Sequence, residues 1–166
     1  VARSDAEHGM HKAPANEVIE GIVDLQVLLQ DAHLARLYQT GINCMRPFGP
    51  RGLRVWGART LSSEPEWRHI STRRSMSAIV AAVERGCEWA VFETNNQRLW
   101  KRLTRMVASF LTGLREQGML AGATPEQAFF VQCNHETNPP ENVDRGMLVT
   151  RIGLAISRPV EFIVFR

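Results

Sequence analysis

The strongest constraint on the fold of this chain is an amphipathic run of residues beyond its midpoint. We predict a long helix over residues 96–117, capped by Asn95 and followed by Gly118. At 100° per residue, its apolar side chains fall within about 100° of arc. They are Leu99, Leu103, Met106, Val107, Phe110 and Leu114. Such a stripe is stable only when another element covers it, so the run predicts a packed domain.

The opposite side of this predicted helix is basic. It carries Arg98, Lys101, Arg102 and Arg105 with no acidic residue among them. Exposed helices usually mix charges of both signs, so this face is either a solvated surface without a partner or a docking surface for an acidic partner. Nucleic acid is the generic acidic partner. The chain has no nucleic-acid motif and only one Tyr for base stacking.

The net charge of +3 is distributed unevenly along the chain. The balance is −3 over residues 1–45, +7 over residues 46–105 and −1 over residues 106–166. The middle of the chain is therefore where an acidic partner is expected to bind.

Length and composition are those of an ordinary globular protein. The 166 residues fit one compact domain, with 44% apolar and 22% charged residues. This excludes a disordered tail, a collagen-like rod and a coiled coil. No apolar run approaches the roughly 18 residues of a membrane-spanning helix.

The remaining pattern mixes helices and strands, which predicts the α+β class with a mixed sheet flanked by helices. Helices are expected at residues 32–39 after Asp31, at 72–85, and as a single turn at Pro125. Strands are expected at residues 42–45 and 53–56 as a hairpin, and at 128–133, 148–156 and 160–165. Residues 1–21 and 23–29 are expected to be extended, and residues 89–92 to form a short buried extended run.

Side chains suited to catalysis or metal binding do not form a convincing pattern. Cys44, Cys87 and Cys133 are too widely spaced for a zinc site and odd in number for a disulfide framework. Cys133 and His135 have the spacing of a nucleophile and base on one strand face, as a hydrolase requires, but a core cysteine beside a surface histidine is the simpler interpretation. We therefore predict no catalytic residue, metal or cofactor, and no enzyme activity.

Several long runs closely resemble the contractile tail sheath proteins of phages, phage-tail-like bacteriocins and related injection systems. They cover nearly the whole chain in the family's order. The runs are Lys12–Ala15, Gly41–Phe48, Arg51–Ser62, Glu66–Arg68, Arg73–Arg74, Trp89–Glu93, Leu99–Trp100, Gly122–Glu126, Phe129–Val131 and Arg158–Arg166.

The resemblance implies a structural subunit that polymerises around an inner tube and contracts to drive the tube through a target envelope. It implies hexameric rings stacked helically, with the tube, baseplate and tail terminator proteins as further partners. It implies neither nucleic-acid binding nor membrane insertion. The particle would be a virion tail or phage-tail-like particle assembled in the bacterial host cytoplasm. The alternative function is a basic nucleic-acid-binding domain.

The resemblance also assigns roles to particular residues. Arg98, Lys101, Arg102 and Arg105 become candidates for contact with the tube. Val160, Phe162, Ile163, Val164 and Phe165 become candidates for a strand that completes a neighbouring subunit's sheet by strand exchange. Residues 1–21 are expected to be an extended linker, and residues 22–166 the sheath C-terminal domain, part of a larger sheath chain.

Overall fold

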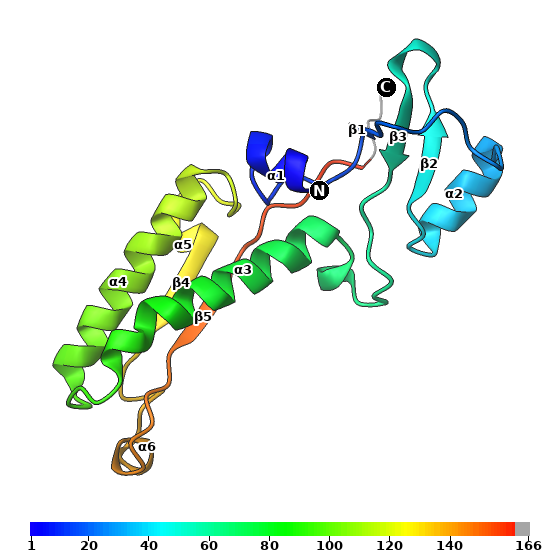
Figure 1. The fold of residues 1–166 in the computed structure, drawn as a ribbon. Helices are drawn as coiled ribbons and strands as arrows, with labels where there is room; N and C mark the ends of the chain where they lie inside the picture. The colour runs from blue at the N-terminus through cyan, green and yellow to red at the C-terminus, as the bar shows by residue number, and fades with distance from the viewer. Residues whose placement is uncertain (162–166) are drawn as a thin grey trace. The chain divides into compact units, whose positions relative to one another are not determined.

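A computed structural model gives the fold and describes residues 1–161 (Figure 1). The helices are α1 (Ala2–His8), α2 (Asp31–Gln39), α3 (Ile70–Cys87), α4 (Gln97–Glu116), α5 (Pro125–Ala128) and α6 (Pro140–Asp144). The strands are β1 (Glu17–Val18), β2 (Cys44–Pro47), β3 (Leu53–Trp56), β4 (Phe129–Gln132) and β5 (Arg151–Leu154). Short 3₁₀ turns lie at Gly49–Arg51, Pro65–Trp67 and Glu88–Ala90. The predicted α+β class is confirmed.

The chain divides into two compact units, which are described separately. Among the described residues, the first unit comprises 1–75 and 158–161, and the second comprises Met76–Ser157. Each unit has its own antiparallel sheet, with strand order β1-β3-β2 in the first and β4-β5 in the second. Among the described residues, two antiparallel sheets thus take the place of the single mixed sheet that we expected.

The first unit is built around the predicted hairpin. β2 and β3 pair with Met45 opposite Val55, and β1 adds to the free side of β3 with Glu17 opposite Val55. The predicted helix at residues 32–39 is confirmed as α2, which contacts β2. Asp31 lies in its first turn and Gln30 is the N-cap residue.

Gly57 permits a close approach of the chain at the end of this hairpin. Its φ of 148° is rarely adopted by other residues, and an added Cβ would lie 2.6 Å from Asn43 Oδ1 and 3.1 Å from the Tyr38 ring. A side chain at residue 57 would therefore separate β3 from α2.

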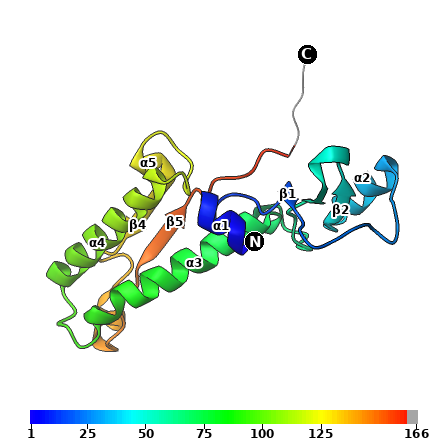
Figure 2. The same cartoon turned by 45° about the horizontal axis from the view of Figure 1, so that its top comes forward.

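The second unit packs α4 against the β4–β5 hairpin. β4 and β5 pair with Val131 opposite Ile152, and α4 contacts β4. α4 runs beside β4 in both views of the fold (Figure 2). The short helix α5 leads directly into β4.

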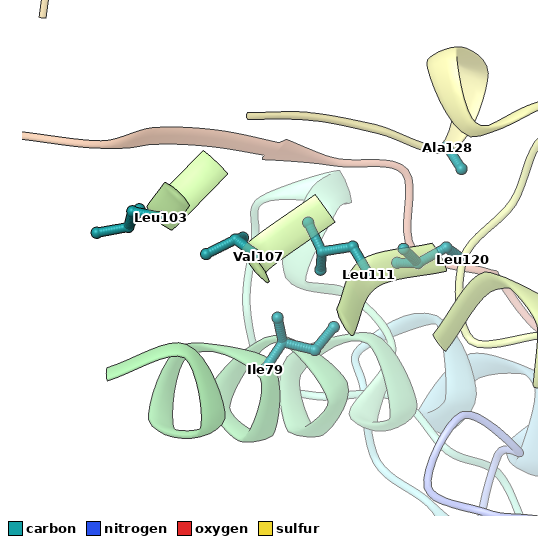
Figure 3. Packing of buried hydrophobic residues seen from close by; sticks show 6 residues of the cluster. All are labelled: Ile79, Leu103, Val107, Leu111, Leu120 and Ala128. Atoms are coloured by element: carbon teal, nitrogen blue, oxygen red, sulfur yellow. The ribbon is translucent and has the colours of Figure 1, made fainter. Parts of the chain in front are cut away.

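One apolar cluster fills the centre of the second unit. Ile79 of α3 points toward α4, whose Leu103, Val107 and Leu111 lie in a row (Figure 3). Leu120 and Ala128 complete the cluster, and Leu111 and Ala128 have no exposed surface. The amphipathic run thus supplies half of this cluster.

The buried stripe of α4 is rotated from its predicted position. Trp100 and Leu111 are buried at 4% and 0% exposure, although neither belongs to the predicted stripe. Phe110 was expected in the stripe but is 37% exposed. α3 and the β4–β5 hairpin both contribute to the cluster around α4, so the buried arc is centred roughly 40° around the helix axis from the predicted centre.

The start of α4 is also shifted by one residue. Asn96, not Asn95, is the N-cap, and its side chain accepts hydrogen bonds from the backbone N–H groups of Arg98 and Leu99. The Asn95 side chain instead accepts a hydrogen bond from Trp100 Nε1 at 2.7 Å and donates one to the Met147 carbonyl at 2.9 Å.

Two of the expected extended segments differ from the structure. Residues 1–21 contain α1 and β1, and Asp5 of α1 pairs with Arg74. Residues 23–29, expected as a short strand or an extended piece, form neither a strand nor a helix. The expected buried run at 89–92 is wrong, because it includes the end of a 3₁₀ turn and Phe92 is fully exposed. The run is apolar, but it lies in the short connection between α3 and α4.

Neighbouring residues of α4 test this packing. We expect Leu111→Ala to lower the free energy of unfolding by about 2–5 kcal/mol, because it leaves a cavity in the buried cluster. Phe110→Ala should cost no more than about 1 kcal/mol. Urea denaturation followed by circular dichroism measures both. Equal losses of unfolding free energy in Leu111→Ala and Phe110→Ala would contradict the rotated position of the buried stripe.

Candidate assembly surfaces

The four predicted cations of α4 form one exposed surface, which we call the basic face. Arg98, Lys101, Arg102 and Arg105 are all exposed, on the side of α4 opposite the buried cluster. Within residues 1–161, none of them forms a salt bridge. Their charges are therefore available to a partner.

Two features shape the basic face. The Arg102 guanidinium lies over the Trp89 ring, 4.1 Å from its centroid, which is cation–π geometry. Lys101 and Arg105 border an open hollow of about 440 Å³, together with Thr104 and residues 131–134. The basic face therefore combines one cation that is stacked on an aromatic ring with two cations at the rim of a concave surface.

A second group of polar side chains lies in the first unit and was not predicted. The Glu161 cluster consists of Tyr38, Arg59, His69 and Glu161. Arg59 donates from Nε and Nη2 to the two carboxylate oxygens of Glu161, at 2.9 and 2.7 Å. Tyr38 donates its hydroxyl to Glu161 Oε1 at 2.5 Å. The cluster joins residues more than 100 positions apart in the sequence.

Backbone pairing places the members of this cluster. Arg59 and His69 face each other across an isolated antiparallel bridge. The Asn43 side chain hydrogen-bonds both the N–H and the carbonyl of Arg59, each at 2.8 Å. The Arg59 guanidinium also lies 4.2 Å from the centroid of the Tyr38 ring. These contacts hold Arg59 in place in addition to its ion pair with Glu161.

Burial and pairing shift the protonation equilibria of the cluster. The hydrogen bonds from Arg59 lower the pKa of Glu161 from 4.5 to about 2, against the opposing effect of burial. Burial, with the hydrogen bond to Glu161, raises the pKa of Tyr38 to about 12. Burial lowers the pKa of His69, whose Nδ1 lies 3.5 Å from Glu161 Oε1 without a hydrogen bond. At neutral pH the cluster is therefore an Arg–Glu ion pair beside a neutral Tyr and His.

The candidates for an exchanged strand lie just after this cluster. Val160 is 81% exposed and is not part of a strand. Phe162, Ile163, Val164 and Phe165 lie outside the described residues. The strand expected at 160–165 therefore stays a prediction.

Cys133 and His135 have different partners in the second unit. The amide of Asn138 donates to Cys133 Sγ at 3.6 Å, and the His135 ring makes an edge contact with Trp100. Cys44, Cys87 and Cys133 are free thiols. No group of residues within 1–161 is arranged to hold a metal ion, and no helix in that range has the length and apolar character to cross a membrane.

The Glu161 cluster had one detectable signal in the sequence. Glu161 is the only charge within the apolar run Val160–Phe165. A carboxylate in such a run is stable when buried only with a cationic partner, so a partner could have been expected. The sequence does not predict that this partner is Arg59, which lies 102 residues before Glu161.

The fold is that of sheath subunits from contractile injection systems. The chain superimposes on a chain of the anti-feeding prophage baseplate with a TM-score of 0.94 and 37% identity, covering 99% of this chain and 46% of that one. It matches the sheath complex of an extracellular contractile injection system, PVC, in the contracted state, with a TM-score of 0.92 and 37% identity, covering 98% and 47%.

The chain belongs to the phage tail sheath family. Residues 62–166 match the phage tail sheath C-terminal domain, and residues 1–61 match the phage tail sheath protein central domain. The two matches meet at residues 61 and 62, whereas the expected division lay between residues 21 and 22. A putative prophage major tail sheath protein of Pseudomonas aeruginosa (strain UCBPP-PA14) is 27% identical over 99% of this chain. The chain spans 42% of that relative's length.

The low pKa of Glu161 leads to a pH prediction. A carboxyl whose pKa is depressed by folding stabilises the fold fully above its unfolded pKa, near 4.5, and loses that effect as the pH falls to about 2. We expect the stability difference between the wild type and Glu161→Gln to reach roughly 3 kcal/mol above this range and to shrink below it. Urea denaturation at several pH values measures the difference.

The control for this experiment is Glu141→Gln, since Glu141 is exposed. Its effect on stability should be small and should change little with pH. A wild-type advantage over Glu161→Gln that stays constant between pH 2 and 6 would contradict the ion pair.

Proposed function

We propose that this chain forms part of a structural subunit of a contractile sheath, which polymerises around an inner tube and contracts to drive the tube through a target envelope. The observation that carries the proposal is the match to a contracted sheath, the anti-feeding prophage helical sheath, over 99% of this chain with a TM-score of 0.92 and 36% identity. This role requires assembly and movement rather than catalysis. Its place is a virion tail or phage-tail-like particle, assembled in the bacterial host cytoplasm and contacting baseplate and terminator proteins.

The basic face is the surface proposed to contact the tube. Its four exposed cations lack acidic partners in the described part of the chain. Exposed ion pairs contribute only about 0.2–1 kcal/mol each and are screened by salt. Weak contacts repeated over many subunits hold a tube firmly in sum, yet each is broken easily when the sheath moves.

The proposed links between subunits are strands exchanged at the ends of the chain. An added strand binds through backbone hydrogen bonds, which tolerate sequence variation and keep neighbours connected. Residues 162–165 are the candidates, with Val160 at their start. The Glu161 cluster supports this proposal, because it holds residue 161 to the first unit through three hydrogen bonds to its carboxylate.

Charge reversal tests the tube contact. We expect Arg98→Glu with Arg105→Glu to weaken co-assembly of the sheath with its tube strongly at low salt and less at high salt, because the lost attraction is electrostatic. Co-sedimentation with purified tubes across a salt series measures this. The matched control is Arg85→Glu with Arg145→Glu, which changes the net charge equally at two other exposed positions. Co-assembly unchanged from the wild type would refute the contact.

Proline substitution tests the exchanged strand. Ile163→Pro removes a backbone donor and should prevent polymerisation if residue 163 pairs with a neighbouring sheet. Ile163→Val keeps the donor and the β-branched shape, so it should assemble normally. Electron microscopy of sheath preparations distinguishes tubes from unassembled subunits. Normal tubes from the proline variant would exclude pairing at this residue.

A further inference from the structure

Phe92, in the connection between α3 and α4, combines two unfavourable features. Its φ is 67°, in the left-handed region that bulky residues rarely adopt. Its side chain is fully exposed, and that of Val91 is 61% exposed. The fold therefore holds an aromatic ring in water on a strained backbone. Such strain persists only where the surroundings impose it, and it is concentrated at functional positions.

The residues before Phe92 are fixed to α4. The Trp89 ring lies beneath the Arg102 guanidinium, and Trp89 Nε1 donates to Met106 Sδ at 3.2 Å. The backbone N–H of Val91 donates to the Glu88 carbonyl at 3.1 Å. The connection therefore leaves α3 along the surface of α4.

The residues after Phe92 are fixed as well. Glu93 donates its backbone N–H to the Ala90 carbonyl, and Asn95 bridges Trp100 and the Met147 carbonyl. With both sides held, the backbone at Phe92 is ordered. An aromatic side chain on an ordered backbone binds a partner without the entropy cost of ordering a loop, and aromatic side chains dominate the energetics of many interfaces.

The position of Phe92 connects it to the basic face. Trp89, three residues before it, is covered by Arg102, and Arg98 follows six residues after it at the start of α4. The connection also holds two exposed acids, Glu88 and Glu93, whereas the basic face holds none. A partner that meets both features needs carboxylates for the cations and an apolar recess for the ring.

We propose that Phe92 is the apolar anchor of the surface formed by the basic face, and that it enters an apolar recess on the inner tube protein while nearby carboxylates of the tube meet the cations. This inference rests on the proposed function, in which the basic face contacts the tube. Charge complementarity favours an acidic partner, because the four cations of the basic face form no salt bridge within residues 1–161, and in the proposed function that partner is the tube. The anchor supplies attraction that salt does not screen, in addition to the screened ion pairs.

The test replaces the ring without straining the backbone further. Asn tolerates the left-handed region, so Phe92→Asn removes the anchor and should keep or raise the thermal stability of the sheath subunit. We expect its affinity for purified tubes to fall about tenfold to a hundredfold, the effect of losing one buried aromatic side chain. The fold-change should stay nearly constant across a salt series, unlike that of Arg98→Glu with Arg105→Glu.

Two further variants complete the design. Leu61→Asn removes another apolar side chain, 81% exposed, and should bind tubes like the wild type. Phe92→Leu keeps an apolar side chain at the anchor position and should recover part of the affinity. A tube affinity that is higher for Phe92→Leu than for Phe92→Asn would show that the effect comes from apolar contact rather than from the shape of the connection.

The outcomes separate this inference from the proposed function. If the charge variant loses tube binding while Phe92→Asn binds like the wild type, the anchor is wrong and the tube contact stands. If both variants bind tubes normally, the tube contact itself is wrong. If Phe92→Asn binds tubes but fails to polymerise into sheath without them, the ring contacts a neighbouring copy and the inference is overturned.

Discussion

The burial of one side of α4 determines what the other side presents. Leu103, Val107 and Leu111 are held in the apolar cluster of the second unit, which fixes the rotation of the helix about its axis. The cations on the opposite side must then face outward. A helix free to rotate would average its charge over all directions, whereas this packing concentrates four cations on one surface. The core and the proposed tube contact are therefore two consequences of the same amphipathic pattern.

In the first unit, an ion pair fixes the path of the chain, much as the packing of α4 fixes the direction of the basic face. Arg59 is oriented by Asn43 and by the bridge to His69, and it receives Glu161 in a bidentate ion pair. A bidentate pair specifies direction as well as attraction. Residue 161 is therefore held at a defined point of the first unit. A link that carries load between subunits needs such a point, since otherwise tension would peel the chain from its own domain.

The sequence predicted the elements that depend on local patterns and missed those that depend on distant contacts. α2, α3, α4 and the β2–β3 hairpin follow from periodicity and from Gly and Pro positions. The Glu161 cluster could not be found in this way, because its members lie up to 123 residues apart. Phe92 shows a second limit of prediction from local patterns. The apolar run 89–92 predicts burial, yet the run lies in the connection between α3 and α4, and the Phe92 ring is exposed. Apolar character alone does not distinguish a core residue from a binding residue.

The combination of weak ion pairs with one apolar anchor suits a contact that must hold and then release. Ion pairs act over several ångströms and guide two surfaces together, but salt and water weaken them. An inserted ring contributes only while it is buried, so its attraction ends within a short displacement. A sheath subunit that moves away from its tube would lose the anchor first and the charges gradually. The contact would then resist small fluctuations and yield to the large movement of contraction.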